Sequence, residues 1–125
     1  MVKKTTTAQS QAEAEQILDI ITKILEDGKA QDIVVMDLQG KTSIANYMVI
    51  ASGGSNRQVA ALADNIQLKL KEAKFKSVAE GKEKADWVLI DAFDVIVHIF
   101  RPEVREFYSI EKMWSSVGKI RSAGN

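Results

Sequence analysis

The residues of this chain that could carry chemistry fall into two stretches. One is the Ser-Gly-Gly-Ser turn over residues 52–55, which follows an apolar run and precedes a helical pattern. The other runs from Trp87 to Phe100 and holds Asp91, Asp94 and the only histidine, His98. Each stretch has a chemical explanation and an ordinary structural one.

The turn from Ser52 to Ser55 is a candidate phosphate site. Helix N-termini present free N–H groups and a partial positive charge, and glycines let a ligand approach the backbone. The turn matches neither the Walker loop nor the dinucleotide-binding glycine pattern. Ser55 and Gln58 also have the spacing of a capping box, which accounts for the serine without a ligand. We therefore favour a structural turn and helix cap.

Gly54-Ser55 also resembles the glycine–serine element of nucleotidyltransferases. Those enzymes follow it with two carboxylates one residue apart, which hold magnesium against the phosphates. The corresponding region here offers only Asp64, and no Asp-x-Asp occurs in the chain. A nucleotide-binding enzyme using the Ser52–Ser55 turn is thus the alternative function. The favoured interpretation is a non-enzymatic protein with no catalytic, cofactor-binding or metal-binding residues.

Asp91 and Asp94 flank the expected tight turn Ala92-Phe93 between two strands. Aspartate commonly accepts a hydrogen bond from the backbone of its own turn, and this explanation is favoured. The functional alternative is a negative rim for a basic partner. A metal site would need more donors than the neighbouring sequence offers.

His98 lies in an apolar strand and, on strict alternation, shares a face with Ile96 and Phe100. We expect a half-buried histidine hydrogen-bonded to a neighbour, such as an aspartate of the hairpin. Catalysis would require a nucleophile within reach, and no serine has a spacing that recommends it. A surface or interface role is favoured.

Trp87 stands at the start of a strand, where partial exposure is expected. Tryptophan with tyrosine and arginine is typical of interface hot spots, and Tyr108 follows the second strand closely. A lysine-rich region before and after the short strand expected over 77–80 could touch RNA (Lys69, Lys71, Lys74, Lys76, Lys82 and Lys84). Glutamates interrupt this region, so a solvated face is the favoured interpretation.

Bulk composition excludes several classes of protein. A chain of 125 residues suits one domain. Its formal net charge is zero, which argues against affinity derived mainly from neutralising phosphates. The chain has no cysteine for disulfides or thiol catalysis. No apolar run approaches the length of a membrane span, and residues 1–7 lack the apolar core of a signal peptide. We expect a cytoplasmic protein that does not bind membranes.

Helical and strand patterns alternate along the chain. They predict a helix from a capping box at Ser10 to Gly28, strands over 32–38 and 46–51, a helix after Ser55, a short strand over 77–80, two strands within 87–100 and a helix from Pro102. This order indicates an α/β fold in which helices flank a mixed β-sheet. Residues 10–115 are expected to form one domain between flexible ends at 1–9 and 116–125.

Several segments of the chain, in order and spacing, resemble the ribosomal silencing factor family, RsfS, also called Iojap. They are Asp32-Ile-Val-Val-Met-Asp-Leu38, Tyr47-Met-Val-Ile-Ala-Ser-Gly53, Arg57-Gln-Val-x-Ala-Leu-Ala-Asp64, Glu80-Gly81, Trp87-Val-Leu-Ile-Asp91, Asp94-Val-Ile-Val-His98-Ile-Phe-Arg-Pro-Glu-x-Arg105-x-Phe-Tyr108 and Met113-Trp114. The resemblance extends from about Asp19 to Trp114.

That resemblance implies a fold like that of nucleotidyltransferases without their catalytic carboxylates. It also implies binding to the large ribosomal subunit through ribosomal protein uL14. The bound protein would block joining of the small subunit and repress translation under nutrient limitation. The partner surface implied by the family includes its tryptophan and the hairpin. The residues expected to bind the partner are Trp87, Asp91, Phe93, Asp94, His98 and Tyr108.

Two residues depart from the family pattern. Asn46 stands where aspartate is frequent, and Phe93 stands where glycine is usual at the hairpin turn. Neither change is expected to abolish binding. A peripheral contact of the Lys69–Lys84 region with ribosomal RNA and a homodimer formed off the ribosome are further expectations.

Overall fold

The computed structural model describes residues 8–109, 112 and 119–122. Its elements, in chain order, are α1 (Ala8–Asp27), β1 (Gln31–Asp37), β2 (Tyr47–Ser52), α2 (Asn56–Glu72), β3 (Val78–Glu80), β4 (Trp87–Ala92), β5 (Val95–Phe100), α3 (Pro102–Tyr108) and β6 (Lys119–Ser122). Up to α3, this is the order predicted from the sequence.

The strands of the described residues form one six-stranded mixed sheet in the order β3-β4-β5-β2-β1-β6. Only β2 and β5 run parallel, and the other neighbours are antiparallel. Every residue of β2 is buried, as its continuous apolarity predicted, because this strand lies inside the sheet with a layer on each face. The predicted mixed α/β fold is confirmed.

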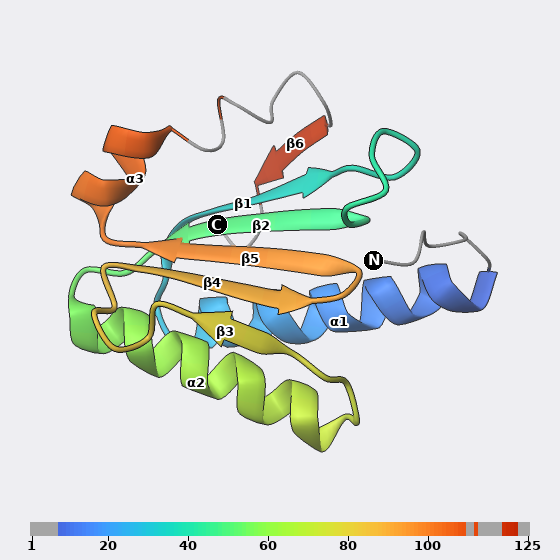
Figure 1. Cartoon of the computed structure of the whole chain (residues 1–125), viewed down its shortest axis with the longest axis horizontal. Helices are drawn as coiled ribbons and strands as arrows, with labels where there is room; N and C mark the ends of the chain where they lie inside the picture. Colours follow the sequence, from blue (N-terminus) through green and yellow to red (C-terminus); the bar gives the residue numbers. More distant parts are fainter. Residues whose placement is uncertain (1–7, 110–111, 113–118, 123–125) are drawn as a thin grey trace.

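Two apolar layers hold the sheet. Helices α1 and α2 pack together along one face (Figure 1). This face carries the larger core, which includes Ile21 of α1, Ile66 of α2 and Val97 of β5. The opposite face carries a smaller cluster, in which Phe100 of β5 packs with Val104 of α3. Helix α3 therefore covers part of the face that α1 and α2 leave open.

The ends of α1 differ from the predicted ones. The chain is already helical at Ala8, so Ser10 lies within α1 and not at its cap. Gly28 does follow the helix, but the left-handed residue there is Lys29, with φ of 65°. A side chain at Gly28 would collide with the side chain of Leu62 on α2. The glycine thus favours the close approach of the two helices.

The C-terminal residues 119–122 also differ from the prediction. They form β6, antiparallel to β1, within the segment expected to be a flexible tail. The sequence Lys119-Ile-Arg-Ser offers one apolar residue, which is too little for a strand pattern. Its strand conformation follows from backbone pairing with β1.

The hairpin between β4 and β5 turns one residue later than predicted. Ala92 pairs with Val95, so the two loop residues are Phe93 and Asp94 and not Ala92 and Phe93. Ala92 is fully buried in the larger core, which keeps it in the strand. In the resulting register, Trp87 lies opposite Phe100.

Candidate functional site

Three rings of β4 and β5 form one aromatic cluster. The indole N–H of Trp87 donates a 3.1 Å hydrogen bond to Nδ1 of His98. The Trp87 and Phe100 rings are stacked with centroids 5.0 Å apart, and the His98 and Phe100 rings with centroids 5.7 Å apart. The indole of Trp87 is consequently fixed in orientation while remaining partly exposed.

His98 lies deeper than expected. Its side chain is only 8% exposed, and burial lowers its pKa to about 4. The imidazole is therefore uncharged at neutral pH, and because Nδ1 accepts the bond from Trp87, its proton resides on Nε2. The expected aspartate partner was wrong, since the neighbour that bonds His98 is Trp87. Trp87 and Asp91 both lie on the face of His98, but the carboxylate of Asp91 accepts the Phe93 N–H in the loop, whereas the Trp87 indole bonds Nδ1.

Strand alternation places Leu89 and Ile96 on the same face as Trp87 and His98. Both aliphatic side chains are partly exposed. We call this surface the β4–β5 face, made of Trp87, Leu89, Asp91, Ile96, His98 and Phe100. Leu89, Ile96 and Phe100 were absent from the predicted site, although the alternation of side chains along each strand would have been enough to add them.

The hairpin loop separates its two aspartates. Asp91 is exposed, and its Oδ1 accepts a 3.0 Å hydrogen bond from the Phe93 N–H, which is the expected turn chemistry. Asp94 is only 7% exposed, and its carbonyl accepts hydrogen bonds from the N–H groups of Asn46 and Tyr47. An exposed negative rim can therefore include Asp91 but is not expected to include Asp94.

Phe93 occupies a strained position with an exposed side chain. Its φ of 65° lies in the left-handed region, where glycine is free of strain. The ring is 62% exposed. Phe93 borders a hollow of about 310 Å³ together with Ile44, Val78, Asp91 and Ile96. The exposed Phe93 ring thus extends the apolar surface beyond the β4–β5 face.

Asn46, the other residue expected to depart from the family pattern, belongs to a polar network. Its side-chain amide N–H donates to Oε1 of Gln11 at 3.2 Å. Gln11 and Gln39 both donate to the hydroxyl of Tyr47, at 3.1 and 2.8 Å. These contacts attach α1 to the start of β2, a structural role that an amide can fill.

Tyr108 ends α3, but its side chain lies outside the described residues. The helix itself is anchored by Arg105, whose Nη1 donates 2.8 Å hydrogen bonds to the Asp32 carbonyl and to Oγ of Ser52. Ser52 is 1% exposed, so this bond satisfies a buried hydroxyl. Arg105 thereby positions α3 on the ends of β1 and β2.

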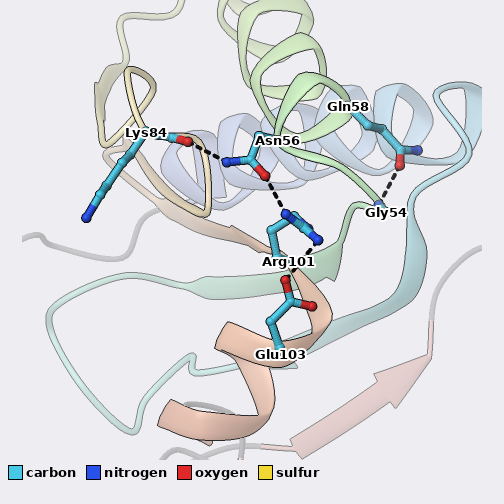
Figure 2. Close-up of polar contacts among 6 residues, drawn as sticks. All are labelled: Gly54, Asn56, Gln58, Lys84, Arg101 and Glu103. Carbon is cyan, nitrogen blue, oxygen red and sulfur yellow. Dashed lines mark hydrogen bonds and ion pairs between the residues drawn. The ribbon is translucent and has the colours of Figure 1, made fainter.

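Polar groups of the turn before α2 are hydrogen-bonded to other residues of the chain (Figure 2). The Gly54 N–H donates a 2.6 Å bond to Oε1 of Gln58, and Oγ of Ser55 accepts a 3.0 Å bond from the Gln58 N–H. The side chain of Asn56 donates to the Lys84 carbonyl and accepts from Arg101. These contacts favour the structural turn and cap over a phosphate site.

Acidic and basic side chains near α2 are partly paired. Asp64, the only carboxylate available to the enzyme alternative, forms an ion pair of 3.0 Å with Lys82. Lys69 pairs with Glu72 at 3.3 Å.

Among the described residues, no group of three or more histidine, cysteine, aspartate or glutamate side chains could hold a metal ion. In the same part of the chain, no helix has the length and apolarity to cross a membrane.

Comparison with known proteins supplies the family. The family model described as "Ribosomal silencing factor during starvation" matches residues 11–124. A ribosomal silencing factor RsfS of Zymomonas mobilis is 50% identical over 107 residues, which cover 85% of this chain and 80% of the relative. A mouse protein named "Mitochondrial assembly of ribosomal large subunit protein 1" is 31% identical over 78% of this chain and 45% of its own length.

A solved structure agrees with the sequence relatives. The crystal structure of a Chromobacterium violaceum protein superposes with a TM-score of 0.79 at 46% identity, covering 82% of this chain and 86% of the other. The match of the family model spans the region that contains the β4–β5 face. The chain belongs to the ribosomal silencing factor (RsfS) family.

Proposed function

We propose that this protein binds the large ribosomal subunit through ribosomal protein uL14 and thereby blocks joining of the small subunit. The observation that carries the proposal is the fixed, partly exposed indole of Trp87 on the β4–β5 face. A rigid aromatic side chain surrounded by apolar neighbours is the usual centre of a protein–protein interface. Membership of the RsfS family supports a ribosomal partner.

Steric exclusion accounts for repression without chemistry. A protein that occupies the intersubunit side of uL14 needs affinity and bulk, and no reacting group has to be supplied. The neutral, buried His98 suits this role, because its contribution is to hold Trp87 in place. We further propose that the protein acts in the cytoplasm. That it acts when nutrients are short is suggested by the name of the family model.

The proposal is tested with purified ribosomal subunits. Addition of the protein to large subunits, followed by small subunits, is expected to reduce the joined ribosomes resolved in a sucrose gradient. Adding it after the subunits have joined should have a much smaller effect, because the docking surface is then enclosed. Equal inhibition in both orders of addition would contradict steric exclusion.

Two subsidiary contacts stay predictions. Homodimerisation off the ribosome is checked by light scattering, and it should compete with uL14 if both use the β4–β5 face. Contact of the Lys69–Lys84 region with ribosomal RNA is checked by the salt dependence of large-subunit binding. The pairing of Lys69 and Lys82 with carboxylates reduces the charge available for RNA.

A further inference from the structure

A groove of about 660 Å³ lies between the end of α2 and β3. Apolar side chains line it from both elements and from the segment between them, namely Leu68, Phe75 and Val78. Leu68 is 53% exposed and Val78 is 67% exposed, whereas Phe75 is partly buried against the larger core. Large apolar side chains exposed together on one surface are typical of binding sites.

Lysines surround this apolar groove. Lys71, Lys74 and Lys76 all line it. Their neighbours Lys69 and Lys82 form ion pairs with carboxylates. Among the described residues, Lys71, Lys74 and Lys76 have no carboxylate within ion-pair distance. The groove therefore carries three lysines that have no ion-pair partner among the described residues.

The groove runs beside an open sheet edge. Strand β3 is the last strand on its side of the described sheet and pairs only with β4 (Figure 1). An edge strand has backbone N–H and C=O groups that can pair with an added strand. Val78 pairs with Asp91, at the end of β4 distant from Trp87. The groove therefore lies away from the aromatic cluster, but at Val78 it adjoins the hollow beside Phe93 and Asp91.

We infer that this groove binds an extended acidic segment of a partner protein, which adds as a strand along β3 and seats apolar side chains against Leu68 and Val78. Carboxylates of the segment complement Lys71, Lys74 and Lys76, and alternate side chains enter the apolar groove. RNA fits less well, because aliphatic side chains offer no stacking surface for bases. This docking site goes beyond the proposed function: it adjoins the β4–β5 face at Val78, but its lysines and Leu68 lie outside that face.

Fluorescence anisotropy with the full chain tests this inference. The probe is a short labelled peptide in which glutamate alternates with valine or leucine. We expect saturable binding that Lys71→Glu combined with Lys74→Glu weakens by about tenfold or more, because attraction becomes repulsion. The matched control reverses Lys23 and Lys29 to glutamate. It changes the net charge by the same amount at residues that do not line the groove, and it should bind as the wild type does.

Three further changes, two in the protein and one in the peptide, separate the contributions to binding. Leu68→Ala should weaken probe binding several-fold, and replacing the glutamates of the peptide by glutamine should abolish it. Trp87→Ala should leave it unchanged, so this test can fail independently of the ribosomal proposal. Absence of saturable binding, equal loss in the Lys23 and Lys29 control, or tighter binding of an oligouridylate of similar length would overturn the inference.

Discussion

The indole N–H of Trp87 donates to the Nδ1 of His98 across the β4–β5 hairpin, over a distance of 3.1 Å. The bond joins a partly exposed side chain to a buried one and requires the imidazole to be uncharged at Nδ1. Protonation of His98 and retention of this bond are therefore mutually exclusive. The orientation of the indole on the proposed docking surface depends on that neutral histidine.

Stability is expected to fall in mild acid. Because burial lowers the pKa of His98 from 6.5 to about 4, the unfolded chain binds a proton at pH values where the folded chain does not. The neutral, buried His98 therefore contributes its full share to the free energy of unfolding above about pH 6.5. This contribution, roughly 3 kcal/mol, is lost as the pH falls toward 4. Urea unfolding between pH 7 and pH 5 measures the effect, since His98 is the only histidine.

The control for this pH dependence is His98→Phe. It should be folded and should show a much flatter dependence of unfolding free energy over the same range. An equal slope in the variant would mean that another group carries the effect.

The Phe93→Gly variant should separate turn strain from surface contact. Glycine removes the strain of a left-handed φ, which costs about 1 kcal/mol. The greater conformational freedom of glycine in the unfolded chain offsets part of this gain. The melting temperature is therefore expected to stay level or rise. Large-subunit binding should weaken, because the exposed ring is lost. A melting temperature several degrees lower would show that the Phe93 ring stabilises the fold.

The Arg105→Gln variant should destabilise the fold by about 1–3 kcal/mol. It removes a charged donor from the Asp32 carbonyl and from the hydroxyl of Ser52, which is 1% exposed. Thermal unfolding measures the loss. The matched control is Arg57→Gln, an exposed arginine of α2, and it should unfold at the wild-type temperature. Equal behaviour of the two variants would contradict the anchoring role.

Much of this architecture could be predicted from local patterns. The alternation in β5 placed His98 with Ile96 and Phe100, and the spacing of Ser55 and Gln58 predicted the cap of α2. The partner of His98 could not be predicted, because Trp87 and Asp91 both lie on its face and side-chain contacts decide between them. Strand β6 was missed because its pairing with β1 is long-range and its residues carry no strand pattern.

The candidate site was predictable only in part, because it also depends on contacts between residues far apart in the sequence. Sequence patterns identify faces of single strands, whereas Ile44 and Val78 join Phe93 through tertiary packing. The burial of Asp94 likewise follows from its position beside the start of β2, to which its carbonyl is bonded. The role of each predicted residue in partner binding stays a prediction.

The most direct test of the central claim is the affinity of the Trp87→Ala variant for isolated large ribosomal subunits and for purified uL14. Removal of a hot-spot tryptophan costs about 2 kcal/mol or more, so both dissociation constants should rise about 30-fold. The matched control, Leu68→Ala, truncates an exposed apolar side chain outside the β4–β5 face and should bind like the wild type. Wild-type affinity of a folded Trp87→Ala variant for both partners would contradict the account.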